Sequence, residues 1–278
     1  MRLSEHPLAL EWLGQFDARD LQIGRLLLDS LKLVSHSDLE ASIAKVIDGI
    51  LASTSSYLAI FPVDEALIDP ESKPGSSGRL AHEATNLARV FPDRILVQPK
   101  AAEMRAKLVK NIVLLDDFVA SGKRVRDFWK VWATPTIRSW LSYGVCRLWV
   151  AGYAIHEVGM ETILKRITYL KIDHTRFEIN LSASGPYWPR VVLDFCEQNA
   201  SRTELPIYPF GIGHLGAPIV FEHGCPDNCP VVLWKGGKSF RPLFPNRGIP
   251  EQLRGCFGGK DDPGRGPRIF WNHERHAS

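Results

Sequence analysis

The stretch NIVLLDDFVASGKR, residues 111–124, decides the fold. Its apolar run predicts a buried strand over residues 111–115, which delivers Asp116 and Asp117 to the carboxyl edge of a sheet. The Ser-Gly-Lys that follows predicts a glycine-containing turn and the start of a helix. Ligands of open α/β sheets bind at that edge, and free N–H groups at a helix start bind phosphate. The stretch therefore predicts a sugar-phosphate site, in which carboxylates accept hydrogen bonds from sugar hydroxyls.

A plainer interpretation of the same residues stays open. An apolar run followed by aspartate is common in α/β proteins, where the acids are solvated and the turn only caps a helix. Motif matches of this length are hypotheses until their structural context is known.

The segment resembles the phosphoribosyl pyrophosphate (PRPP) signature of type I phosphoribosyltransferases: a strand, Asp-Asp, three residues, Thr or Ser, Gly, any residue, and Thr or Ser. The resemblance implies that Asp116 and Asp117 are the catalytic pair, which holds the ribose hydroxyls and, with the ligand, Mg²⁺. It also implies that Ser121, Gly122 and Lys123 bind the 5′-phosphate. The final hydroxyl position is occupied by Arg124. Arginine can bind phosphate through a bidentate fork, so Arg124 is included in the predicted phosphate site.

The order of elements before the signature supports this resemblance. Helical spacing predicts two helices within residues 8–35 and a third over 38–52, with Ser37 and Glu40 as its capping box. A strand at 57–61, a loop at 64–78, a helix at 79–90, a strand at 94–98 and a basic segment follow. This is the element order of the type I phosphoribosyltransferase core.

Two further groups of site residues follow from the resemblance. The loop after the first strand binds pyrophosphate in that family, which here implies Ser76, Ser77 and Gly78. The segment before the signature forms a hood whose basic residue stabilises the departing pyrophosphate, which implies a catalytic role for Lys100 or Arg105. For any single basic residue, a solvated helix face is the competing interpretation.

The predicted fold class is α/β, with a type I phosphoribosyltransferase-like core made of a mostly parallel twisted sheet flanked by helices. Downstream patterns predict helices at 125–132, 157–169 and 189–197 and strands at 145–154 and 170–181. The predicted organisation is a helical N-terminal segment (1–55), the α/β core (56–205) and an irregular, β-rich C-terminal extension with a basic Gly/Pro-rich tail (206–278).

The C-terminal part contains a second informative stretch, residues 217–234, which predicts a strand, a turn and a second apolar strand. His223, Cys225 and Cys229 permit a zinc interpretation, but the spacing is wide and no second pair follows, so a structural turn is favoured. With His223 and Asn228, the turn resembles that of divergent phosphoribosyltransferase-like proteins of bacterial conflict and anti-phage gene clusters. This narrower resemblance spans about residues 8–247.

That resemblance implies an effector or accessory component of a defence system. Some of these relatives are encoded beside a reverse transcriptase in retrons, which implies a protein or ribonucleoprotein partner. Three functions therefore stay open: an active transferase on a ribose-phosphate ligand, a catalytically inactive sensor or scaffold, and a nucleic-acid-binding partner that uses the basic, aromatic-containing tail.

Composition restricts the class of protein without choosing among these functions. The net charge of +3 and the 23% of charged residues are ordinary for a globular protein. Five cysteines in 278 residues fit reduced thiols, and neither a long apolar span nor a signal peptide is visible, so a cytoplasmic location is expected. The acceptor substrate and any homo-oligomer stay open.

Overall fold

The computed structural model describes residues 1–64, 66, 77–182 and 187–258. Its contacts divide the chain into two units. The first, called here the terminal unit, contains residues 1–38 together with 184–278, and the second, the core unit, contains residues 39–183. This division groups the N-terminal helices with the C-terminal segment, whereas the sequence analysis assigned them to separate segments.

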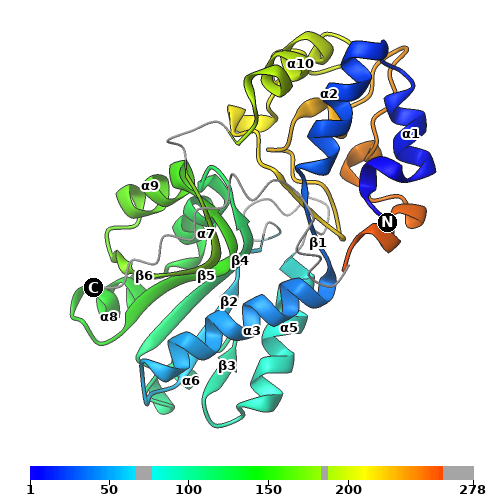
Figure 1. The fold of residues 1–278 in the computed structure, drawn as a ribbon. Coiled ribbons are helices and arrows are strands. Elements are labelled where there is room, and N and C mark those ends of the chain that lie inside the picture. The colour runs from blue at the N-terminus through cyan, green and yellow to red at the C-terminus, as the bar shows by residue number, and fades with distance from the viewer. Residues whose placement is uncertain (65, 67–76, 183–186, 259–278) are drawn as a thin grey trace. The chain divides into compact units, whose positions relative to one another are not determined.

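A five-stranded parallel sheet of order β3-β2-β4-β5-β6 forms the centre of the core unit (Figure 1). Its strands are β2 (Leu58–Pro62), β3 (Ile95–Val97), β4 (Asn111–Val119), β5 (Arg147–His156) and β6 (Leu170–Leu181). All residues of β2 and β4 are buried. Such continuous apolar runs are typical of parallel strands covered on both faces.

Helices cover this sheet. They are α3 (His36–Ala52), α5 (Ser77–Val90), α6 (Ala101–Ala106), α7 (Lys123–Trp132), α8 (Pro135–Ser142) and α9 (Glu157–Arg166). Apolar side chains of α6 to α9, among them Phe128 and Ile163, share one hydrophobic core with β4 and β5. The predicted α/β class, with a parallel sheet flanked by helices, is confirmed.

The central strand is longer than its sequence pattern predicts. The apolar run ends at Leu115, but β4 continues to Val119 because Phe118 and Val119 still pair with Ala154 and Ile155 of β5. The prediction that Asp116 and Asp117 mark the strand tip is therefore wrong. Both acids lie inside the strand, and the turn begins three residues after Asp117.

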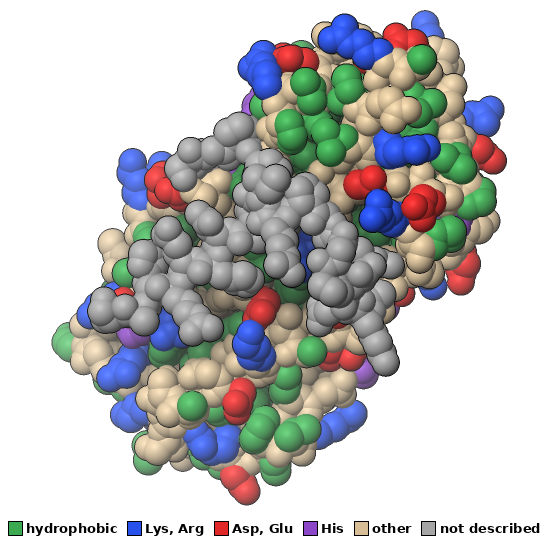
Figure 2. Space-filling view, viewed as in Figure 1, with side chains coloured by type: hydrophobic (Ala, Val, Ile, Leu, Met, Phe, Trp, Pro, Cys, Tyr) green, Lys and Arg blue, Asp and Glu red, His purple; other side chains and the backbone are tan. Residues whose placement is uncertain are grey.

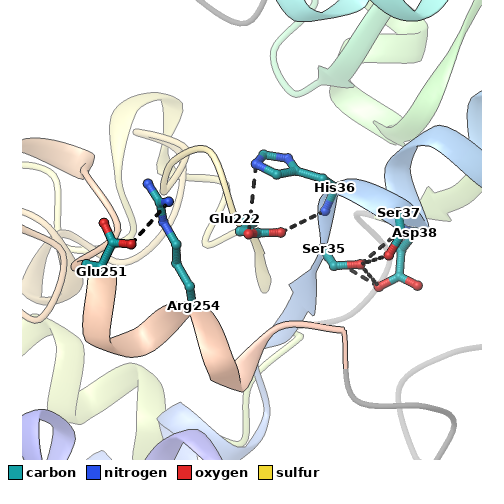
Figure 3. Close-up of polar contacts among 7 residues, drawn as sticks. All are labelled: Ser35, His36, Ser37, Asp38, Glu222, Glu251 and Arg254. Atoms are coloured by element: carbon teal, nitrogen blue, oxygen red, sulfur yellow. Dashed lines mark hydrogen bonds and ion pairs between the residues drawn. The ribbon is translucent and has the colours of Figure 1, made fainter.

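The start of α3 also differs from its prediction. Instead of the expected capping box of Ser37 and Glu40, the structure has a capping box of Ser35 and Asp38, two residues earlier. There, the Asp38 N–H donates to Ser35 Oγ (3.0 Å), and the Ser35 N–H donates to Asp38 Oδ2 (3.2 Å) (Figure 3). Aspartate at the third position is short, but it still reaches back to the backbone, so a Ser-x-x-Asp sequence makes the reciprocal cap.

The terminal unit is built around a short parallel pair, β1 (Lys32–Val34) with β7 (Ile219–Phe221). Its α-helices are α1 (Pro7–Leu13), α2 (Ala18–Asp29) and α10 (Arg190–Ala200), so the two predicted N-terminal helices are confirmed. The 3-10 turns of this unit are Leu3–Glu5, Ile212–His214, Val231–Leu233, Pro245–Arg247 and Glu251–Cys256. The predicted second strand of residues 217–234 is wrong, because its apolar residues form the buried 3-10 turn Val231–Leu233 instead.

The described surface carries charges of both signs, and Lys and Arg side chains are interspersed with Asp and Glu on the face shown in Figure 2. Within the described ranges, none of the helices combines the length and the apolar composition required to cross a bilayer.

Candidate functional site: paired acids and an arginine

The turn from β4 to α7 is shaped by two glycines. Gly122 precedes α7 with φ +74, a left-handed conformation that other residues rarely adopt. A Cβ on Gly122 would lie 2.7 Å from the carbonyl oxygen of Gly159 in α9. A Cβ on Gly159 would in turn lie 2.5 Å from the carbonyl oxygen of Ala120. The turn therefore packs directly on the first part of α9, backbone against backbone.

Asp116 and Asp117 are both buried, with 1% and 6% of their surface exposed. Each carboxylate accepts a hydrogen bond from the next backbone amide: Asp116 Oδ1 from the Asp117 N–H (3.0 Å) and Asp117 Oδ1 from the Phe118 N–H (2.8 Å). The adjacent strand is held close by Gly152, where a Cβ would collide with the carbonyl oxygen of Asp116. The acids are thus fixed in a tightly packed part of the sheet.

Arg124 binds both acids. Its Nε donates to Asp116 Oδ2 (3.2 Å), and its Nη2 donates to Asp116 Oδ1 and to Asp117 Oδ1 (2.6 Å to the latter). Asp116 is therefore held by both ends of the guanidinium fork, a strong, charge-assisted geometry. Arg124, the residue that departs from the PRPP signature, thus contacts both acids of that signature through its side chain.

The three side chains place two carboxyl groups against one guanidinium in a buried position. Burial raises the pKa of Asp116 to about 8; the charge of Arg124 opposes that shift, and the neighbouring Asp117 adds to it. Burial lowers the pKa of Arg124, but the charges of Asp116 and Asp117 outweigh it and hold that pKa above its ordinary value. Arg124 is therefore a permanent cation that lies against both acids.

The other residues of the predicted phosphate loop are held within α7. The Lys123 N–H donates to Ser121 Oγ (3.4 Å), and Lys123 Nζ lies 3.1 Å from Asp127 Oδ2. Asp127 also binds Arg126 and Lys130, and the hydrogen bond from Arg126, with those from the two lysines, holds the pKa of Asp127 well below its usual range. The side chain of Lys123 is thus directed along the helix toward Asp127.

The implied pyrophosphate loop and hood are described in part. Ser76 lies outside the described residues, while Ser77 and Gly78 begin α5. Lys100 is the residue before the first turn of α6, and Arg105 lies in the last turn. Both basic side chains are exposed on the segment between β3 and β4, and their catalytic roles stay predictions.

His223 and Asn228 belong to the terminal unit. The ring of His223 stacks on Phe221 with 5.0 Å between centroids, and it lies parallel to the ring of His36 at 6.3 Å. The carboxylate of Glu222 accepts a hydrogen bond from the backbone N–H of His36 (2.9 Å) and also pairs with the imidazole ring of His36 (Figure 3). The Asn228 side chain donates to the carbonyl oxygen of Ile212, which closes the turn.

The two cysteines of the same turn are both buried. Cys225 and Cys229 are free buried thiols, and the Cys229 thiol donates to the carbonyl oxygen of Ile219 (3.1 Å). Burial raises the pKa of the Cys229 thiol well above its ordinary value. Among the described residues, no three His, Cys, Asp or Glu side chains converge on a common point, so the structural-turn interpretation is favoured.

Sequence reasoning missed the glycines that shape this site. Gly152 lies in the middle of an apolar strand and Gly159 inside a helix, two positions where glycine costs stability. An isolated glycine in a strand often marks a close backbone approach, so a signal for Gly152 was present. Which backbone approaches could not be read from the sequence.

A parallel sheet whose central strand carries paired acids, followed by a left-handed glycine and a helix start, defines a phosphoribosyltransferase-like protein. Comparison with protein families agrees: the PRTase-CE family model matches residues 9–246. The match covers more than half of the chain, which therefore belongs to the PRTase-CE family. No curated protein sequence matches the chain.

Proposed function

We propose that this protein binds PRPP, or a related ribose-phosphate nucleotide, at the junction of β4 and α7. The observation that carries the proposal is the convergence of Asp116, Asp117 and Arg124 beside the turn that leads into α7. Two carboxylates offer acceptors for the 2′ and 3′ hydroxyls of a ribose. The amides of the helix start and a guanidinium offer donors to a phosphate.

The two carboxylates fit Mg²⁺, but they would supply only part of its ligands. Asp116 and Asp117 supply hard carboxylate oxygens, but a protein site of two carboxylates is typical of magnesium that arrives with substrate oxygens and water. When bound with PRPP, magnesium would neutralise the charge of the pyrophosphate. The acids of this chain would then orient the ribose and stabilise positive charge at C1.

In an active transferase, a nucleophile forms a bond to C1 of PRPP while the C1–O bond breaks and pyrophosphate leaves with the electron pair. The transition state is oxocarbenium-like, so positioning and electrostatic stabilisation by Asp116 and Asp117 provide most of the catalysis. Neither acid acts as the nucleophile. Lys100 or Arg105 would stabilise the leaving pyrophosphate.

A second function is favoured by one observation. Arg124 occupies the acids, and Lys123 is bound by Asp127, so both cations of the turn already have carboxylate partners. This arrangement suits a protein that binds its ligand without turnover, as a sensor or scaffold. Pyrophosphate release from PRPP distinguishes the two functions: an active transferase releases it in the presence of its acceptor, and a sensor does not.

For the cellular role, we propose an effector or accessory component of a bacterial anti-phage system, such as a retron, with a protein or ribonucleoprotein partner. The support is the resemblance of the turn at His223 and Asn228 to proteins of such systems. The test is phage plating on cells that carry the gene with its neighbours. Wild type is expected to reduce plaque numbers, and a variant with Asp116→Ala and Asp117→Ala is expected to lose that protection.

The binding proposal is tested by titration calorimetry with PRPP and Mg²⁺. Wild type is expected to bind, and the variant with Asp116→Asn and Asp117→Asn is expected to bind PRPP at least about tenfold more weakly, since neutral amides are weaker acceptors. A double variant of two exposed acids, Asp48→Asn with Asp93→Asn, changes the net charge equally and is expected to bind as wild type does. Absence of PRPP binding by the wild-type protein would contradict the proposal.

A further inference from the structure

The amino ends of β4, β5 and β6 carry a group of exposed apolar side chains. These three strands are parallel neighbours, so their amino ends meet at one edge of the sheet, opposite the edge at which the turn into α7 lies. The side chains are Leu108, Tyr143, Val145 and Ile172, of whose surface 71%, 83%, 43% and 61% is accessible within the described part of the chain. Single exposed apolar residues are ordinary, but several of them on adjacent segments indicate a contact surface.

Hydrogen bonds hold these segments side by side. The N–H of Arg147 donates to the carbonyl oxygen of Lys110 (2.8 Å), and the Cys146 thiol donates to the carbonyl oxygen of Val109 (3.1 Å). The loops before β4 and β5 are therefore joined. Ile172 lies one strand further along, where β6 bulges beside the start of β5. The apolar side chains thus belong to one edge of the core unit, called here the amino edge.

Leu108 has a backbone conformation that leucine rarely adopts, with φ +52. It follows α6 as Gly144, with φ +67, follows α8. In each case the next residue donates its N–H to a carbonyl oxygen in the last turn of the helix (2.9 and 2.8 Å), so both helices end in the same cap. Glycine is the usual residue of this cap because it has no Cβ. A strained and exposed leucine in its place points to a role of the side chain outside the fold.

Positive charge surrounds the apolar side chains. Asp173 is an exposed acid on the β6 bulge. Burial and the charges of Arg147, Lys171 and Arg176 nevertheless lower the pKa of His174 on the same bulge, while Asp173 opposes that shift. Positive charge therefore predominates at the start of β6. The exposed basic residues directly beside the apolar ones, in the chain or at the start of the same strands, are Lys107, Lys110, Arg147 and Lys171.

We propose that the amino edge docks on a lipid bilayer with anionic headgroups. Leu108, Tyr143 and Ile172 enter the interfacial region, and the surrounding lysines and Arg147 bind headgroup phosphates. Tyrosine suits this position because its ring is apolar and its hydroxyl stays in contact with water. The proposal goes beyond the ribose-phosphate site and does not depend on it, since that site lies at the other edge of the sheet.

The chemistry of the amino edge favours lipid over other partners. An isologous contact with a second copy would place lysines and Arg147 near like charges, which is unfavourable. A nucleic acid could stack a base on Tyr143, but it offers no apolar surface to Leu108 or Ile172. Leu108 and Tyr143 project with most of their surface exposed, so a protein partner would need a hollow shaped to receive them. A bilayer receives projecting apolar side chains without such a match.

The first test is co-sedimentation of the full chain with vesicles. Wild type is expected to bind vesicles of phosphatidylcholine with about 30% phosphatidylglycerol at least about tenfold more tightly than vesicles of phosphatidylcholine alone. An increase of the salt concentration from about 0.05 M to about 0.5 M is expected to weaken that binding at least about tenfold, because it screens the headgroup charge.

Leu108→Gly separates lipid binding from folding. Glycine relieves the strain at this position, so the variant is expected to melt at the same temperature as wild type or higher. It nevertheless loses the apolar side chain, and its affinity for the anionic vesicles is expected to fall at least about tenfold. Val158→Ser is the control, since Val158 is an exposed aliphatic residue at the start of α9, at the opposite edge. Its effect on vesicle binding is expected to stay below about twofold.

A charge variant tests the basic residues. Lys110→Gln with Lys171→Gln is expected to weaken binding to the anionic vesicles at least about tenfold at low salt, and to have little effect at high salt. Arg19→Gln with Arg25→Gln, two exposed positions of α2 in the terminal unit, changes the net charge equally. That control is expected to weaken binding less than about threefold.

Three results would overturn the proposal. The first is wild-type protein that binds neither kind of vesicle, or binds both equally well. The second is folded Leu108→Gly protein with the vesicle affinity of wild type. The third, seen by sedimentation velocity, is a wild-type dimer that Leu108→Gly dissociates while vesicles are not bound, which would assign the amino edge to a second copy of the chain.

Discussion

Gly122 and Gly159 meet backbone to backbone, so that a Cβ on Gly122 would lie 2.7 Å from the carbonyl oxygen of Gly159. The contact joins the turn after β4 to the first half of α9. It leaves no room for a side chain, and Gly122 additionally has a positive φ. The path of the chain past the two acids is therefore fixed by close packing as well as by local turn preferences.

Substitution of Gly122 separates these two effects, because Gly144 offers a control. Both residues have positive φ, but nothing lies within 4 Å of a Cβ on Gly144. Gly144→Ala is expected to cost about 1 kcal/mol of unfolding free energy from backbone strain alone. Gly122→Ala is expected to cost about 3 kcal/mol, because the overlap with Gly159 adds to the strain. Urea denaturation of both variants measures the difference, and equal losses would show that the close approach is unimportant.

Arg124 should also be essential for stability, since it is the cationic partner of two buried carboxyl groups. Arg124→Ala is expected to lower the unfolding free energy by about 3 kcal/mol, because it removes a cationic partner from buried carboxyl groups. Arg126→Ala removes an arginine that pairs with the adjacent Asp127 on the helix surface, and it is expected to cost less than about 1 kcal/mol. Chemical denaturation of the two variants tests the prediction, which similar losses would contradict.

The cap of α3 gives a third prediction. Ser35→Ala removes the hydroxyl that accepts from the Asp38 N–H, and it is expected to cost about 1 kcal/mol. Ser37→Ala keeps that hydrogen bond, so its expected cost is below about 0.5 kcal/mol. Thermal melting of both variants shows which serine caps the helix. A larger loss for Ser37→Ala would restore the capping box that the sequence alone suggested.

A buried glutamate makes stability depend on pH. Burial raises the pKa of Glu83 in α5, and the charge of Glu40, with which it shares a hydrogen bond, raises it further, while His82 opposes the shift. The folded state then holds a proton that the unfolded state releases, so the stability contributed by Glu83 is full below its ordinary pKa of about 4.5 and falls as the pH rises through the folded value.

The variant Glu83→Gln does not titrate at this position. Its melting temperature is therefore expected to exceed that of wild type by about 2 °C or more at pH 8, and the advantage is expected to vanish near pH 4. Glu161→Gln, on the surface of α9, is the control and is expected to shift the melting temperature equally at both values. An advantage of Glu83→Gln that is independent of pH would contradict this account.

Much of the fold was predictable because the pattern of apolar residues determines strands and helices locally. The runs around Leu58, Ile112 and Leu148 predicted buried strands, and the parallel sheet follows from the helices between them. The end of β4 was not predictable, because the pairing of Phe118 and Val119 depends on a neighbouring strand distant in sequence. The apolar residues 231–233 form a 3-10 turn for a similar reason, since tertiary packing overrides local preference.

The candidate site divides in the same way. Asp116, Asp117 and the turn at Gly122 could be selected from the sequence, because their types and spacing are the signal. The side chains that Arg124 contacts could not be predicted from the sequence. Arginine side chains reach several ångströms in many directions, and sequence spacing does not determine whether this one turns to the acids or to a ligand. Only the packed arrangement shows that it binds the acids.

The pairing of β1 with β7 joins residues 32–34 to residues 219–221. During synthesis on the ribosome, the first strand must therefore wait unpaired until its partner, almost two hundred residues later, has emerged. The core unit is continuous in sequence and has no such delay. The chain can consequently complete its five-stranded sheet while the segment made earliest still lacks its partner strand.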